Sequence, residues 1–89
     1  MADEIKELVK DVSALMEEVI DDRGVPRNIR NIIEQAKDKI NGKGADTMGF
    51  SSAIYLLDDI SNDINMPHHT RTDIWEIISK LETIKEQVK

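Results

Sequence analysis

The side chains best suited to binding chemistry are four arginines and two histidines, which gather in residues 22–33 and 63–75 of this 89-residue chain. They are Arg23, Arg27, Arg30, His68, His69 and Arg71. Guanidinium groups beside helix N-termini commonly bind a phosphate, a nucleic-acid backbone or an acidic peptide. If both segments lie along one edge of the fold, all of these residues except Arg23 form a candidate anion-binding or partner-binding edge, called the turn edge below. In the alternative that we favour, Arg30 and Arg71 are used internally and the other side chains are solvated.

The histidines, cysteines and carboxylates give no pattern typical of a metal or catalytic site. His68 and His69 are adjacent, so on a helix they point about 100° apart and cannot share one metal ion as residues i and i+4 do. The chain has no cysteine, which excludes a disulfide, thiol catalysis and cysteine-bound zinc. Carboxylate runs such as Asp58-Asp59 are typical of a solvated helix face. We therefore predict no catalytic residue, no metal site and no cofactor.

The two basic segments are copies of one sequence pattern, and each is predicted to form a tight turn between two helices. Asp, Pro, Arg and Ile occur at identical spacing in both copies, and one constant offset relates the first copy to the second. The pairs are Asp22/Asp63, Pro26/Pro67, Arg30/Arg71 and Ile33/Ile74. A period near 40 with two helices in each unit is typical of HEAT-type repeats, whose units bury their apolar faces against one another.

Each predicted turn carries two charges that oppose the helix dipoles. Asp22 and Asp63 are at predicted helix C-termini, where a negative charge is unfavourable. Arg30 and Arg71 are near predicted helix N-termini, where a positive charge is unfavourable. Ion pairs across each turn, Asp22–Arg30 and Asp63–Arg71, would remove both conflicts. We predict these pairs as structural clamps, each contributing about 1–3 kcal/mol if partly buried and under ~1 kcal/mol if exposed.

Apolar residues recur at helical three-four spacing along four segments, which predicts an all-α protein. The predicted helices cover about residues 3–22, 26–41, 46–63 and 67–87. Asp46 and Thr47 are candidate caps of the third helix. The fourth helix starts at Pro67, or uses Thr70 or Thr72 as its cap.

The strongest helix breaker, Asn-Gly-Lys-Gly at residues 41–44, divides the chain into two helical hairpins. We predict one helical domain over residues 1–89, with hairpins at about 3–41 and 46–88 joined by residues 42–45. Two such hairpins either close into a four-helix bundle or stack as a HEAT-like pair. The sequence leaves these two arrangements open.

Net charge and hydropathy argue against non-specific nucleic-acid binding, membrane insertion and secretion. The net charge is −6 and the pI is about 4.8, which disfavours non-specific attraction to nucleic acid or to an anionic membrane. No apolar run approaches the roughly 20 residues that a membrane-spanning helix needs. The acidic first four residues lead directly into a predicted helix, unlike a signal peptide. We therefore expect a soluble, cytoplasmic protein without a membrane partner.

Trp75 lies one position off the main apolar stripe of the last predicted helix, near Ile78 and Glu82. It can flank the core or anchor a partner, because tryptophan is enriched at interface hot spots. We expect core packing, and we retain Trp75 as the candidate interface anchor.

Several segments resemble a small archaeal family catalogued as uncharacterised protein family 0147. These segments are Val25-Pro-Arg-Asn-Ile-Arg30, Asp59-Ile-Ser-Asn-Asp63, Met66-Pro67, His69-Thr-Arg-Thr72, Ile74-Trp75 and Ser79-Lys-Leu-Glu82. The resemblance covers nearly the whole chain and implies a short, all-helical, cytoplasmic archaeal protein, with no activity to transfer. The chain departs from the family pattern at Ile64, where relatives often have Pro, and at His68, where they have an apolar residue.

Together these observations favour a non-enzymatic helical interaction module. It would recognise a protein partner, or itself, through exposed helix faces, with Trp75 and the turn edge as candidate contacts. The alternative is a nucleic-acid-associated or ribosome-associated accessory protein that binds phosphates through the turn edge. An enzyme is the least supported class, because no residue pattern predicts a catalytic pocket.

Overall fold

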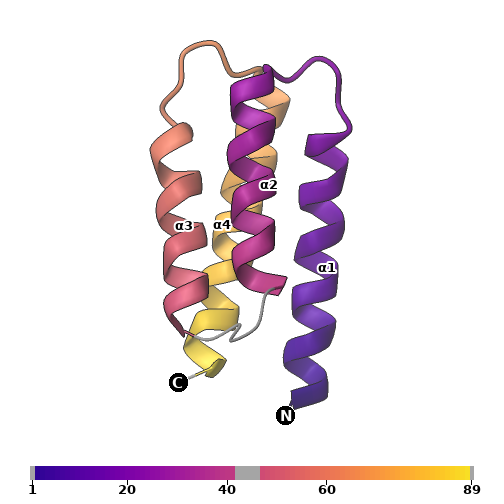
Figure 1. Cartoon of the computed structure of the whole chain (residues 1–89), viewed down its shortest axis with the longest axis vertical. Coiled ribbons are helices and arrows are strands. Elements are labelled where there is room, and N and C mark those ends of the chain that lie inside the picture. Colours follow the sequence, from indigo (N-terminus) through magenta and orange to yellow (C-terminus); the bar gives the residue numbers. More distant parts are fainter. Residues whose placement is uncertain (1, 42–46, 89) are drawn as a thin grey trace.

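A computed structural model describes residues 2–41 and 47–88, and these residues form four α-helices (Figure 1). The helices are α1 (Ala2–Ile20), α2 (Arg27–Asn41), α3 (Thr47–Ile60) and α4 (His68–Val88). They confirm the predicted all-α class and the number of helices. The predicted joint at residues 42–45 and the candidate cap Asp46 lie outside the described residues. The last helix begins directly after Pro67 and not at a threonine cap.

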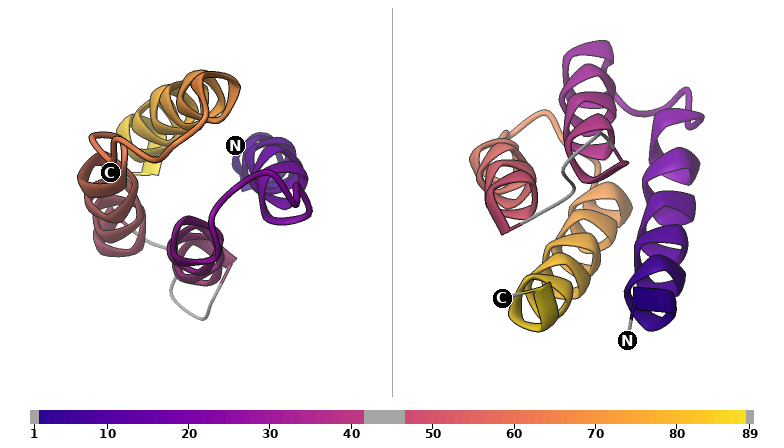
Figure 2. Two further views of the ribbon diagram at one scale, coloured as in Figure 1. Left: turned by 90° about the horizontal axis from the view of Figure 1, so that it is seen from above. Right: turned by 60° about the horizontal axis from the view of Figure 1, so that its bottom comes forward.

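The four helices close into a bundle. Each helix packs against two neighbours: α1 and α3 each lie against both α2 and α4, and the described parts of the diagonal pairs do not approach closely. Figure 2 shows this ring from above, with α4 inclined to the others. This ring of contacts identifies a closed four-helix bundle and not a HEAT-like stacked pair.

Successive helices run in opposite directions, so that both interhelical turns, residues 21–26 and 61–67, lie at the same end of the bundle (Figure 1). The N-termini of α2 and α4 therefore lie at that end as well. This placement meets the condition for a continuous turn edge.

The core lies on the bundle axis and is almost entirely aliphatic. Every helix contributes side chains at three-four spacing, which places them on one face. The fully buried positions include Val12 and Met16 of α1, Ile29 and Ile33 of α2, Phe50 and Leu57 of α3, and Ile74, Ile77, Leu81 and Ile84 of α4. Burial of a large aliphatic side chain contributes about 1.5–3 kcal/mol, so this axis provides most of the stability of the fold.

The two turns have the same hydrogen-bond pattern at corresponding positions of the repeat. In the first turn Asp22 Oδ1 accepts a 2.8 Å bond from the backbone N–H of Gly24. In the second turn Asp63 Oδ1 accepts a 2.8 Å bond from the N–H of Asn65. An aspartate that bonds to the N–H two residues later offers the chain an alternative to helix. For this reason α1 and α3 end at Ile20 and Ile60, before the aspartates that we expected inside the helices.

Candidate functional site

The exposed part of the turn edge consists of Arg27, His68 and His69, with Arg23 beside them. The side chains of Arg23, Arg27 and His68 make no hydrogen bond or ion pair with the residues that the structure describes. Carboxylates of Asp21, Asp22 and Asp63 lie in the same turns. The edge is therefore mixed in charge, which weakens its attraction for a polyanion.

His69 is used inside the molecule. Its Nε2 lies 3.0 Å from Asp22 Oδ2, which joins the α1–α2 turn to the first turn of α4. The hydrogen bond from His69 and the N–H of Gly24 hold the pKa of the Asp22 carboxyl below its ordinary value of 3.8, and the positive charge of Arg30 adds to this effect. His69 is therefore less available to a ligand than its exposure suggests.

The two predicted clamps have different partners in the structure. Arg71 Nη2 donates a 2.9 Å bond to the backbone carbonyl of Asp63 and makes no ion pair with its carboxylate. Arg30 forms no hydrogen bond in residues 2–41 and 47–88, and the Nε atoms of both arginines are buried without a partner. This corrects the predicted Asp22–Arg30 and Asp63–Arg71 pairs. In both turns Oδ1 of the aspartate instead accepts the backbone N–H two residues later.

Trp75 is exposed over 57% of its surface, so the expected core packing is wrong. It stands on the solvent side of α4, whereas its neighbour Ile74 is fully buried. Met48, Tyr55 and Ile64 are also large, apolar and exposed. Single exposed apolar side chains are common in soluble proteins, and Trp75 remains a candidate anchor by its accessibility.

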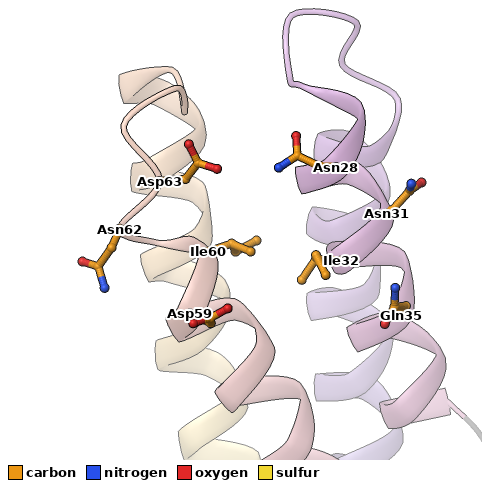
Figure 3. Close-up of a pocket in the computed structure, with 8 residues that line it drawn as sticks. All are labelled: Asn28, Asn31, Ile32, Gln35, Asp59, Ile60, Asn62 and Asp63. Carbon is orange, nitrogen blue, oxygen red and sulfur yellow. The ribbon is translucent and has the colours of Figure 1, made fainter.

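A groove that the sequence did not predict runs between α2 and α3. Its upper part, next to the turns, is open to solvent and has a volume of about 600 Å³ (Figure 3). The lining residues are Asn28, Asn31, Ile32, Gln35, Asp59, Ile60, Asn62 and Asp63. Ile32 and Ile60 point toward each other at the floor. The other lining residues are Asn, Gln and Asp, of which Asn31 and Asn62 point away from the groove, and no lysine or arginine lines this part.

A second, smaller hollow continues along the α2/α3 seam toward the opposite end of the bundle. It has a volume of about 370 Å³. Its lining residues are Lys39, Ser51, Ser52, Tyr55 and Leu56. One seam therefore presents a polar, acidic upper part and a lower part with an exposed aromatic side chain. We call the two hollows together the α2/α3 groove.

At the turn end, the α2/α3 groove is the counterpart of the α1/α4 seam in the repeat. The offset that relates Pro26 to Pro67 also relates Asn28 to His69 and Asp22 to Asp63. Asp22 and His69 are bonded across their seam. Asn28 and Asp63 face each other across the top of the groove (Figure 3), but no hydrogen bond joins them in the described structure. The repeat in the sequence already relates these residues to one another. Only the helix packing shows which helices lie side by side and therefore which residues meet across each seam.

Two further features bear on the class of site. No three His, Cys, Asp or Glu side chains among residues 2–41 and 47–88 are arranged to hold a metal ion. None of the helices, as far as the structure describes them, combines the length and apolar character needed to cross a membrane.

Sequence comparison gives the family. The model of the Uncharacterised protein family (UPF0147) matches residues 1–84.

The chain belongs to UPF0147.

UPF0147 relatives from archaea confirm the resemblance found in the sequence. The UPF0147 protein of Methanocaldococcus jannaschii is 48% identical over 81 residues, which cover 90% of this chain and 87% of that protein. The UPF0147 protein of Pyrococcus abyssi is 42% identical over 86 residues, which cover 96% of this chain and 100% of that protein.

Two solved structures share the fold. The crystal structure of the unknown function protein MMP1188 has a TM-score of 0.83 and 44% sequence identity, with 88% of this chain and 90% of that chain covered. The crystal structure of a UPF0147 protein from Thermoplasma acidophilum has a TM-score of 0.81 and 33% identity, with 89% and 94% covered. The four-helix arrangement is therefore shared with both solved structures, one of which is a UPF0147 protein.

Proposed function

We propose that this UPF0147 protein is a non-enzymatic interaction module that binds a segment of a partner protein along the α2/α3 groove. The observation that supports it most is that no hydrogen bond joins Asn28 to Asp63 in the described structure, whereas their counterparts His69 and Asp22 are bonded to each other. At the turn end, side chains bridge the α1/α4 seam and leave the α2/α3 groove without such a bridge, which favours this groove as a binding face.

The shape and composition of the groove support this proposal. Its upper part falls in the size range of ligand-binding pockets, about 300–1,000 Å³. It combines an apolar floor, Ile32 and Ile60, with the amide of Asn28, which points across the groove and can bond to a peptide backbone. Helix grooves of this kind commonly accept a helix or an extended segment of another protein.

Site-specific photo-crosslinking in the native cell type tests the proposal. A photoreactive amino acid replaces Gln35, which is exposed on the groove, and in a matched control replaces Glu76, its counterpart in the second repeat. We expect a protein adduct of defined mass from position 35 that is absent at position 76 and is competed by excess unmodified protein. Equal adducts at both positions, or no protein adduct at position 35, would contradict the proposal.

The alternative of nucleic-acid or ribosome association is supported by the unpaired Arg23, Arg27 and His68 at the turn edge. Binding through many phosphate contacts weakens steeply as salt rises, whereas binding that depends mainly on the apolar groove floor weakens much less. Affinity purification at low and high salt, with and without nuclease, separates the two functions. Co-purifying material that is lost both at high salt and after nuclease treatment would favour the turn edge. A protein partner that is retained after both treatments would favour the groove.

A further inference from the structure

We infer that the partner segment carries an arginine whose guanidinium group is bound by Asp63 at the upper end of the α2/α3 groove. This inference rests on the proposed function and names the chemistry of the partner. Three observations support it: the contacts of the corresponding residues Asp22 and Asp63, the negative charge of the upper groove, and the apolar floor of the groove.

The α1/α4 seam shows what an aspartate in this position binds. Asp22 Oδ1 is occupied by the backbone N–H of its own turn, while Asp22 Oδ2 faces the nitrogen of His69 at 3.0 Å. Asp63 has the same turn geometry, with its Oδ1 bonded to the N–H of Asn65. Asn28 stands where His69 stands in the other seam, but it does not reach Asp63. The groove therefore leaves a place for an N–H donor from outside.

The negative charge of the upper groove favours a positively charged N–H donor on the partner segment. Asp59, near the end of α3, and Asp63, in the turn that follows, both line the upper groove. No basic residue lines this part, and the chain as a whole carries −6. A carboxylate in this setting is stabilised by a charge-assisted hydrogen bond, which a guanidinium forms in a forked geometry.

Arg71 does not occupy this position. Its guanidinium is bonded to the backbone carbonyl of Asp63 and not to the carboxylate. The equivalent residue in the first repeat, Arg30, contributes to the lowered pKa of Asp22, and Asp22 nevertheless binds His69. A guanidinium at the Arg71 position is thus compatible with a second nitrogen donor at the carboxylate.

The floor of the groove suits the rest of an arginine-containing segment. Ile32 and Ile60 offer an apolar surface to the stem of a long basic side chain. Farther along the seam, Tyr55 and Leu56 offer a surface for a neighbouring apolar side chain. The 15 residues of α2 span about 22 Å, which matches roughly six or seven residues of extended peptide.

A peptide titration followed by NMR tests the inference on the full chain labelled with ¹⁵N. The probe is a blocked heptapeptide of alternating leucine and arginine, compared with the same peptide carrying neutral citrulline for arginine. We expect the arginine peptide to shift amide signals of residues 28–35 and 59–63. The citrulline peptide should bind about tenfold more weakly, because it loses a charge-assisted bond.

Matched variants separate specific binding from general attraction to an acidic protein. Asp63→Asn should weaken binding of the arginine peptide about tenfold. Asp22→Asn removes the same charge at the counterpart position, where His69 already occupies the carboxylate, and should leave the affinity unchanged. Asn28→His should rebuild the internal contact in the groove, which raises Tm and weakens peptide binding.

Three results would overturn the inference: equal weakening by Asp63→Asn and Asp22→Asn, equal binding of both peptides, or tighter peptide binding by Asn28→His. Self-association through residues 28–35 and 59–63 without peptide would also overturn it, in favour of a second copy of this chain. If the adduct at position 35 persists in Asp63→Asn, the groove remains the interaction site and only the arginine assignment fails. If position 35 gives no adduct, the proposed function itself fails.

Discussion

Asp22 and His69, which are 47 residues apart in the chain, are joined by a 3.0 Å contact between Oδ2 and Nε2. The contact bridges the α1/α4 seam at the turn end of the bundle, whereas the counterpart residues Asp63 and Asn28 face each other across the α2/α3 groove (Figure 3) without a bond in the described structure. One difference between the repeats, His69 in place of Asn28, thus distinguishes a structural seam from a candidate binding face.

The Asp22 contact should make stability dependent on acid pH. The pKa of Asp22 is lowered below its ordinary value of 3.8 in the folded protein, first by the bond from His69. A depressed folded-state pKa stabilises the fold above the unfolded-state value, and this contribution is lost as pH falls through the folded-state pKa. Asp22→Asn should therefore lower the free energy of unfolding at neutral pH, and its difference from wild type should vanish in strong acid.

Denaturant unfolding across this pH range measures the effect, with Asp21→Asn as the control. Asp21 is exposed and its side chain makes no bond in the described structure. A difference between Asp22→Asn and wild type that stays constant from neutral to strongly acidic pH would contradict the assignment.

Thr70 should be replaceable with a gain in stability. It is only 1% exposed, and its Oγ1 is buried without a partner in the described part of the chain. Its counterpart in the first repeat is the fully buried Ile29. Because an unsatisfied buried hydroxyl is costly, Thr70→Val should stabilise the protein by about 1 kcal/mol. Thermal unfolding measures this, and Thr72→Val, at an exposed position, is the control that should give no gain.

The two turn arginines should differ in their contribution to stability. Arg71 donates a hydrogen bond to the carbonyl of Asp63, whereas Arg30 makes none within the described residues. Arg71→Met should therefore cost about 1–2 kcal/mol, and Arg30→Met should cost less. Equal losses in urea unfolding would show that the carbonyl bond is not the source of the difference.

The repeat should also be visible in core energetics. Ile33 and Ile74 occupy corresponding positions of the two repeats, and both are fully buried. Truncation of either to alanine should cost about 2–5 kcal/mol in denaturant unfolding, through lost burial and the cavity left behind. Glu34→Ala, at an adjacent exposed position, should change stability by less than about 0.5 kcal/mol. A small effect at only one isoleucine would mean that the two halves of the core are not packed alike.

The local elements were predictable because their causes are local. Three-four apolar spacing predicts the four helices, and proline places the starts of α2 and α4 within one residue. The ends of α1 and α3 were predicted too late, since Asp22 and Asp63 were treated as charges on a helix end. Each instead accepts an N–H two residues later and helps to form the turn.

The sequence by itself determined the helices, the aliphatic core faces and the correspondence between the two turns, because each depends on residue types at regular spacing. The tertiary structure decided which helices share a seam, and therefore that His69 bonds to Asp22 while Asn28 and Asp63 remain apart. It also placed Trp75 in solvent, one residue from the buried Ile74. The physical reason is that a partner in another hairpin depends on how the helices pack, and helical periodicity alone is equally compatible with a closed bundle and an open stack.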